Sequence, residues 1–141
     1  MPNNLCDVPG VLVGHATDPV GATGCTAVLF ERPTVVGMDA RGSSPETRGT
    51  AGLHPTGILA QRHALLLTGG SAFGLAAADG VSRFLEDRGV GLDVGVALIP
   101  LISSAVLFDL ALGSSGNSHS SVSAGMIPGL SLARDPREIT S

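Results

Sequence analysis

One stretch of the chain, residues 65–81, constrains the fold more than any other. Three consecutive leucines at positions 65–67 predict a buried strand, and the adjacent Gly69 and Gly70 predict a tight turn directly after it. An alanine-rich helix is expected to begin at or just after Ser71. Many folds place active sites at such a junction, because the first N–H groups of a helix are unpaired and lie at the positive end of its dipole.

The residues after the turn have the pattern of an amphipathic helix. Charged residues at positions 79, 83, 86 and 87 share one face, and apolar residues at positions 75, 78, 81 and 85 share the opposite face. Gly89 predicts the end of this helix, since glycine readily adopts the left-handed conformation that is common there.

The other expected elements are short. Residues 8–15 predict a turn and a strand, and residues 24–30 and 34–39 predict two strands joined as a hairpin across Arg32-Pro33. Residues 56–62 predict one or two helical turns, and residues 90–96 predict a further strand. The apolar pattern of residues 103–110 fits either a strand or a buried helix. The expected fold class is therefore α/β.

Composition limits the partners of this chain. Its 141 residues suffice for one domain, and 43% hydrophobic against 14% charged residues indicates much buried surface, in a core or in a subunit interface. The net charge is -4, and the only aromatic residues are four phenylalanines. Because nucleic-acid binding favours basic surfaces and stacking side chains, we expect no nucleic-acid partner.

The N-terminus and the cysteines bear on location. Residues 1–5 lack the charged and apolar regions of a signal peptide, and no apolar stretch is long enough to span a membrane. Cys6 and Cys25 have neither metal-ligand spacing nor a dense disulfide pattern, so free thiols in a reducing compartment are expected. These features predict a cytoplasmic protein without a membrane partner.

The glycine turn can be compared with three known sequence motifs. A phosphate-binding loop needs Lys and Ser or Thr where Leu75 and Ala76 stand, and a dinucleotide fingerprint needs glycine where Ser71 stands. The nucleophile elbow, G-x-S-x-G, fits residues 69–72 but has Phe73 in place of its last glycine. Both nucleotide-binding motifs are therefore disfavoured.

Two interpretations of the role of Ser71 remain open. As an elbow nucleophile it could act with Asp93 or Asp109 and with His119, which lies in a serine-rich segment that is a poor platform for a base. As a structural residue it would cap the helix or shape the turn, and this interpretation is favoured because serine is common at such positions.

Other polar residues give weaker signals. His15, His54, His63 and His119 are scattered without metal-ligand spacing, so no metal and no cofactor are expected. Two arginines of the polar loop at positions 40–50 could bind a carboxylate or simply pair with nearby acids. Two further aspartates, Asp39 and Asp109, end apolar runs, where capping of a turn is the common role.

Several segments together resemble one family, the P1-type or DmpA-like aminopeptidases (peptidase family S58). These are residues 8–18 (VPGVLVGHATD), 24–26 (GCT), 39–48 (DARGSSPETR), 67–75 with 78–81 (LTGGSAFGL and ADGV) and 104–110 (SAVLFDL). They occur in the family's order. Each piece alone is weak, and the combination is specific.

The resemblance implies an N-terminal-nucleophile hydrolase that removes N-terminal amino acids from peptides, amides or esters. It implies an αββα sandwich shared with ornithine acetyltransferases, assembly as a homo-oligomer, and no metal. Gly69, Gly70, Ser71 and Phe73 would then line the substrate pocket, and N–H groups around residues 69–71 could stabilise an oxyanion.

The chain also departs from the family pattern. The family's nucleophile follows a later segment, so no catalytic nucleophile is expected here, and Gly116-Asn117-Ser118 is treated as a coincidental match. Phe73 stands where some members have a tyrosine, and Gly49 stands where many have an acid. We therefore divide the chain into residues 1–113, an N-terminal part of the hydrolase domain, and residues 114–141, a serine-rich tail expected to be disordered. A truncated or frame-shifted gene product would explain this division.

Three functions remain open. The chain is the inactive N-terminal portion of an aminopeptidase, a compact serine hydrolase that uses Ser71, or a non-enzymatic oligomeric interaction protein.

Overall fold

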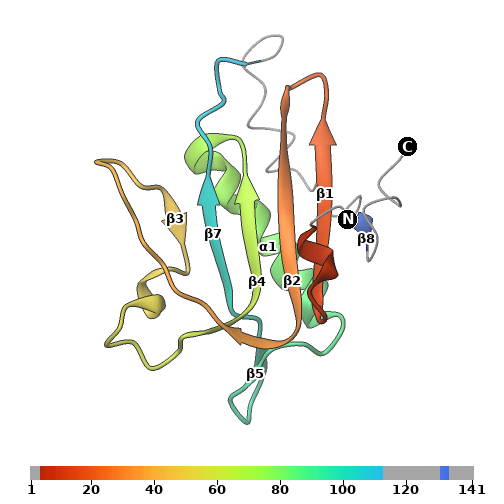
Figure 1. Ribbon diagram of the computed structural model, residues 1–141, viewed down its shortest axis with the longest axis vertical. Helices are drawn as coiled ribbons and strands as arrows, with labels where there is room; N and C mark the ends of the chain where they lie inside the picture. The colour runs from red at the N-terminus through yellow and green to blue at the C-terminus, as the bar shows by residue number, and fades with distance from the viewer. Residues whose placement is uncertain (1–3, 113–130, 134–141) are drawn as a thin grey trace.

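The computed structural model describes residues 4–112 and 131–133. Its centre is a sheet in the order β3-β7-β4-β2-β1-β8 (Figure 1). The inner strands are β1 (Val11–Asp18), β2 (Thr23–Val35), β4 (Gln61–Thr68) and β7 (Ile102–Val106), and the edges are β3 (Thr47–Arg48) and β8 (Ser131–Ala133). The α/β prediction is therefore confirmed.

Helices occupy the connections between these strands. The 3-10 helices η1 (Leu5–Asp7) and η2 (Ala51–Leu53) precede β1 and β4, and η3 (Ser71–Ala76) leads into α1 (Ala77–Glu86). A separate small hairpin consists of β5 (Leu92–Asp93) and β6 (Leu98–Ile99). Within the described residues, no helix is both long and apolar enough to cross a membrane.

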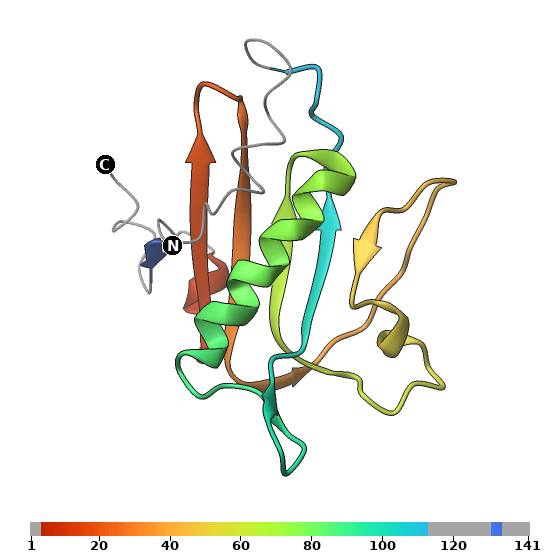
Figure 2. The ribbon, with the colours of Figure 1, turned by 180° about the vertical axis from the view of Figure 1, so that it is seen from behind.

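The pairing of β4 with β7 is parallel, whereas β1, β2 and β4 pair in antiparallel fashion. A parallel neighbour requires the chain to cross back over the sheet, and η3 with α1 makes this crossover. Figure 2 shows α1 lying across the face of the sheet. The carboxyl ends of β4 and β7 consequently lie at the same edge.

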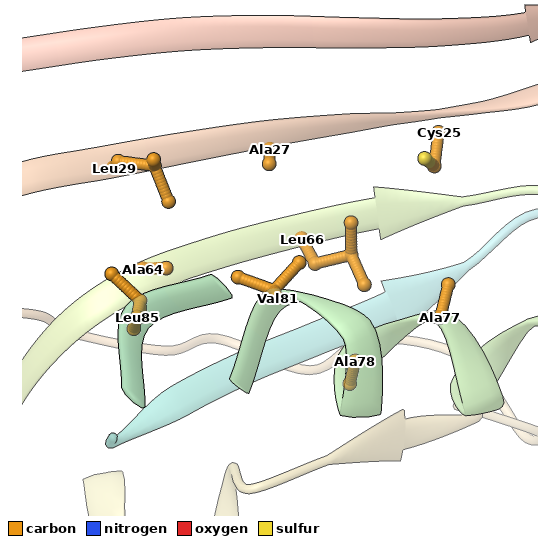
Figure 3. Packing of buried hydrophobic residues seen from close by; sticks show 9 residues of the cluster. All are labelled: Cys25, Ala27, Leu29, Ala64, Leu66, Ala77, Ala78, Val81 and Leu85. Carbon is orange, nitrogen blue, oxygen red and sulfur yellow. The ribbon is translucent and has the colours of Figure 1, made fainter. Parts of the chain in front are cut away.

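The hydrophobic core fills the space between α1 and this face of the sheet (Figure 3). Alternate residues of β2 are buried, as the two-residue period of a strand requires. Ala27 and Ala64 have no exposed surface, and such small side chains allow the helix to approach the strands closely. The core consists of Cys25, Ala27, Leu29, Ala64, Leu66, Ala77, Ala78, Val81 and Leu85.

The amphipathic helix predicted from the sequence is confirmed. Ala78, Val81 and Leu85 are buried, and Asp79 and Arg83 are exposed. Gly89 has a φ of +66°, and the N–H of Val90 donates to the carbonyl of Leu85 across the end of the helix.

Four predicted elements differ from the structure. The hairpin lies between β1 and β2, and β2 runs through Pro33 with an irregular register between Leu29 and Thr34. A strand can pass a proline at such an irregularity, which the local pattern does not reveal.

Residues 56–62 contain no helical turn, since β4 already begins at Gln61, and only Leu92–Asp93 of residues 90–96 form a strand. Strand β8 lies in the segment predicted to be a disordered tail; the rest of that segment is outside the described residues.

Ser103 and Ser104 are adjacent buried serines with opposite hydrogen-bonding status. The Ser103 hydroxyl donates to the carbonyl of Gly49 at 2.8 Å and accepts from Arg62 at 2.7 Å. Ser104 pairs in register with Leu66, so its side chain lies on the core face, where its hydroxyl oxygen has no hydrogen-bond partner in the described part of the chain. A buried hydroxyl without a partner lowers stability.

We therefore predict opposite effects of two alanine substitutions. Ser104→Ala should raise the free energy of unfolding by about 1 kcal/mol, because it removes an unsatisfied polar group. The neighbouring control, Ser103→Ala, should lower it by a similar amount. Denaturant titration of the three proteins measures both, and a destabilised Ser104→Ala protein would contradict the assignment.

Candidate functional site

The predicted glycine turn lies directly after β4, at the upper end of that strand in Figure 1. Gly70 has a φ of +83° and Ser71 a φ of +53°. Glycine adopts this region at little cost, but serine does so rarely, so Ser71 is held in a strained conformation by its surroundings. The turn reverses the chain into η3 within two residues.

The three N–H groups of the turn all have partners inside the protein. Gly69 donates to the carbonyl of Gly24 at 2.8 Å, and Ser71 donates to the carbonyl of Leu107 at 3.0 Å. Gly70 donates to Oδ1 of Asp109 at 2.7 Å. The prediction that these groups could stabilise an oxyanion is therefore wrong for this structure, because each is already engaged.

Asp109 connects the turn to a distant strand. Its second carboxylate oxygen accepts a hydrogen bond of 2.7 Å from the hydroxyl of Thr23, at the start of β2. A Cβ atom at Gly69 would overlap both the Asp109 carboxylate and the Thr23 hydroxyl, and one at Gly74 would overlap the carbonyl of Gly69. The small glycines are thus required by close approach as well as by backbone conformation.

The structural role predicted for Ser71 is only partly correct. Gly70, and not Ser71, is the N-cap of η3, and no side chain caps this helix. Instead, Ser71 shapes the turn through its left-handed backbone, and it lines a cavity.

This cavity has a volume of about 680 Å³ and lies between the 36–47 segment and the sheet. Its apolar lining includes Met38, Leu65, Leu67 and Phe108. Of the four residues predicted to bind substrate, Ser71 is among the lining residues, and Gly69, Gly70 and Phe73 are not. Phe73 is 57% exposed on η3, next to the turn.

The two loop arginines pair with acids. Arg41 contacts Asp39 at 2.6 Å on the surface, and Arg48 contacts Asp79 of α1, also at 2.6 Å. The second contact holds the loop against the helix. The prediction that these arginines pair with nearby acids is confirmed.

Among the described residues, no histidine and acid join Ser71 in a serine-histidine-acid triad. Asp93 lies in β5, at the opposite end of the molecule in Figure 1, and Asp109 already binds Gly70 and Thr23. His119 is outside the described residues. Among those described, His15 Nδ1 pairs with the hydroxyl of Thr26 at 2.8 Å, and no three potential metal ligands cluster.

The other two described histidines have local structural partners. His63 Nδ1 accepts a hydrogen bond of 3.0 Å from the N–H of Leu101, and its side chain is buried. His54 is exposed and its Nδ1 pairs with Thr56 at 2.9 Å. Burial lowers the pKa of His63 below its ordinary value of 6.5, and the nearby positive charge of Arg62 acts in the same direction.

The two cysteines are free thiols. Cys25 belongs to the core, and burial raises the pKa of its thiol. A thiol held protonated in the core is a poor nucleophile, so Cys25 has a packing role.

Sequence reasoning missed the network around Asp109. Asp109 and Thr23 are 86 residues apart, and neither belongs to a motif that implies the other. The only local signal was the position of Asp109 at the end of an apolar run, where an aspartate often caps a turn. It does cap a turn, but one 39 residues earlier in the chain.

A strand-turn-helix site of this kind, on a mixed sheet with a crossover helix, is consistent with the hydrolase family indicated by the motifs. The profile of Peptidase family S58 matches residues 3–126, beyond Gly113, where the resemblance had been expected to end. The chain belongs to this family.

Curated relatives agree with this assignment. An uncharacterized aminopeptidase of Mycobacterium tuberculosis (strain ATCC 25618 / H37Rv) is 47% identical over 121 residues, which cover 79% of this chain and 35% of the relative. One of Mycobacterium leprae (strain TN) is 42% identical over 119 residues, covering 79% and 33%. A 6-aminohexanoate-oligomer endohydrolase of Kocuria sp. (strain KY2) is 38% identical over 105 residues, covering 74% and 27%. The chain thus spans about a third of the length of the two mycobacterial relatives and about a quarter of the endohydrolase.

Removal of the Asp109 carboxylate should loosen the glycine turn. In Asp109→Ala, the N–H of Gly70 and the hydroxyl of Thr23 lose their acceptor, and we expect a loss of about 2 kcal/mol in the free energy of unfolding. Amide exchange at Gly70 should accelerate. Asp39→Ala, which removes an exposed acid, is the control and should change little. Unaltered exchange at Gly70 in Asp109→Ala would contradict this role.

Stability should also depend on His63. Its folded-state pKa is below 6.5, so between that value and 6.5 the unfolded chain binds more protons than the folded protein. This contribution is complete above pH 6.5 and is lost as pH falls through 6.5 toward the folded pKa. Unfolding measured at several pH values should show this loss, and His63→Gln should reduce it, whereas the exposed control His54→Gln should retain it. An equal pH slope in His63→Gln would refute the assignment.

Proposed function

We propose that this chain is the N-terminal part of an amide hydrolase of the N-terminal-nucleophile type. Its substrates would be peptides, amino-acid amides or related esters, from which it releases N-terminal amino acids. Membership of Peptidase family S58 and relatives described as an aminopeptidase and an oligomer endohydrolase support this proposal. The chain covers only about a third or less of the length of those relatives, which supports the proposal that it forms one part of such an enzyme.

The observation that carries the proposal is that each N–H group of the glycine turn already has a hydrogen-bond acceptor within the protein. The N–H groups of Gly69, Gly70 and Ser71 and the carboxylate of Asp109 are all committed to internal hydrogen bonds. With these bonds the turn forms a fixed side of the substrate pocket. The same groups are then not available to polarise a substrate carbonyl. In this proposal the chain supplies the wall and part of the pocket, and a segment outside this chain supplies the nucleophile.

The face of the sheet opposite α1 is the expected contact surface for that second part. Leu67 is 56% exposed there, and Phe108 beside the cavity is 79% exposed. Apolar surface of this kind favours association with another layer of protein. The αββα sandwich would place its second sheet on this face, and the assembled protein would be a cytoplasmic homo-oligomer.

One observation favours a second candidate function, a compact serine hydrolase. Ser71 has the positive φ and the strand-to-helix position of an elbow nucleophile, and it lines the 680 Å³ cavity. Against it stands the absence of a histidine partner for Ser71 among the described hydrogen bonds. Without a base, a serine hydroxyl is a weak nucleophile.

Activity assays of the purified 141-residue chain separate these functions. We expect no hydrolysis of amino-acid p-nitroanilides and no covalent labelling by a fluorophosphonate probe. Turnover that disappears in Ser71→Ala, with a probe adduct on Ser71, would overturn the first function and support the second. Circular dichroism of both proteins ensures that a negative result comes from folded protein.

A further inference from the structure

Arg62 is a buried cation that the catalytic proposal does not use. It lies near the start of β4, is only 4% exposed, and is surrounded by backbone carbonyl groups. Its Nη1 donates to the carbonyls of Leu59 and Gln61, both at 2.7 Å, and its Nη2 donates to Gly49 at 2.8 Å. With the bond from Nε to Ser103, four of the five guanidinium hydrogens have protein acceptors. The second Nη2 hydrogen has no acceptor among the described residues.

No carboxylate of the described chain neutralises this charge. The ion pairs found there join Arg41 to Asp39 and Arg48 to Asp79, and neither involves Arg62. Burial lowers the pKa of Arg62, but a guanidinium remains charged at neutral pH. Its positive charge also contributes to the lowered pKa of His63, so the field of Arg62 reaches its neighbour. A buried charge without a counterion is costly, and a bound anion would reduce that cost.

A cavity of about 410 Å³ adjoins the guanidinium. Besides Arg62, its lining includes Thr50, Leu59, Leu101 and Ile102, and none of the described lining residues is acidic. The Thr50 hydroxyl is paired with that of Thr47 at 2.8 Å. The cavity therefore combines one cationic donor with a mainly apolar wall.

We propose that this cavity binds a short aliphatic monocarboxylate, with its carboxylate on the free Nη2 hydrogen of Arg62 and its alkyl chain against Leu59, Leu101 and Ile102. A single charged donor suits a carboxylate better than a phosphate, whose further oxygens would remain without donors in an apolar cavity. Arg62 and the glycine turn lie at opposite ends of β4, roughly 20 Å apart. The site therefore lies away from the glycine turn, although its lining shares Thr47 and Thr50 with the 680 Å³ cavity.

Gly52 provides a way to block the site without changing its charge. A Cβ atom at this position would lie 3.2 Å from Nη2 of Arg62 and 3.8 Å from the carbonyl of Leu59. Gly52 does not have a positive φ, so its backbone accepts alanine. A methyl group there would cover the guanidinium edge that faces the cavity.

The test titrates the ¹⁵N-labelled 141-residue chain with hexanoate and, separately, with hexanamide, which has the same alkyl chain but no charge. We expect hexanoate to shift the amide resonances of Gly52 and Leu101 with saturation in the millimolar range, and hexanamide to leave them unchanged. Bound hexanoate should also raise the pKa of His63, because it neutralises the positive charge of Arg62. Equal shifts with both compounds, or no shift, would overturn the proposal.

The variants complete the test. Gly52→Ala should weaken hexanoate binding by about tenfold, the effect of losing one charge-assisted hydrogen bond. Gly37→Ala, in an exposed segment where a Cβ would meet nothing within 4 Å, is the matched control and should bind like the parent. Unchanged binding in Gly52→Ala would refute the site, and equal affinity for inorganic phosphate would refute the choice of a monocarboxylate. Because Gly52→Ala retains Arg62, its result does not depend on whether Arg62 variants fold.

Discussion

The parallel pairing of β4 with β7 is the constraint on which the rest of this structure depends. It requires a crossover, which η3 and α1 provide, and it brings the ends of both strands to one edge of the sheet. Asp109 follows β7 at that edge, and Gly70 follows β4, so the carboxylate can accept the N–H of Gly70. The glycine turn is therefore held from outside by a strand that comes later in the chain.

The same arrangement limits the chemistry of the turn. Its three N–H groups already donate hydrogen bonds within the protein, so they cannot also bind a developing negative charge. Ser71 retains a strained backbone and a position beside a cavity, but it has no described histidine partner. A scaffold of this kind fits a family member that needs further residues to complete its catalytic site.

The opposite end of β4 has a different electrostatic character. Arg62 donates four of its five guanidinium hydrogens to carbonyl and hydroxyl oxygens, and these acceptors carry no full negative charge. Hydrogen bonding and charge compensation are separate requirements of a buried ion. Within the described chain the first is met for four of the five guanidinium hydrogens, and the second is not met. This difference is the basis for placing an anion in the cavity beside Arg62, whereas the lining of the cavity beside Ser71 includes both acidic and basic residues (Asp39, Glu46 and Arg41).

The sequence by itself determined the elements around the glycine turn and the family. The leucine run, the two glycines and the helical spacing of charged residues specified β4, the turn and α1, because these depend on residues close together in the chain. Only the tertiary structure decided the partners of the turn, the course of β2 through Pro33 and the burial of Arg62. Each of these depends on contacts between residues far apart in sequence, such as Thr23 with Asp109, and no local pattern records such contacts.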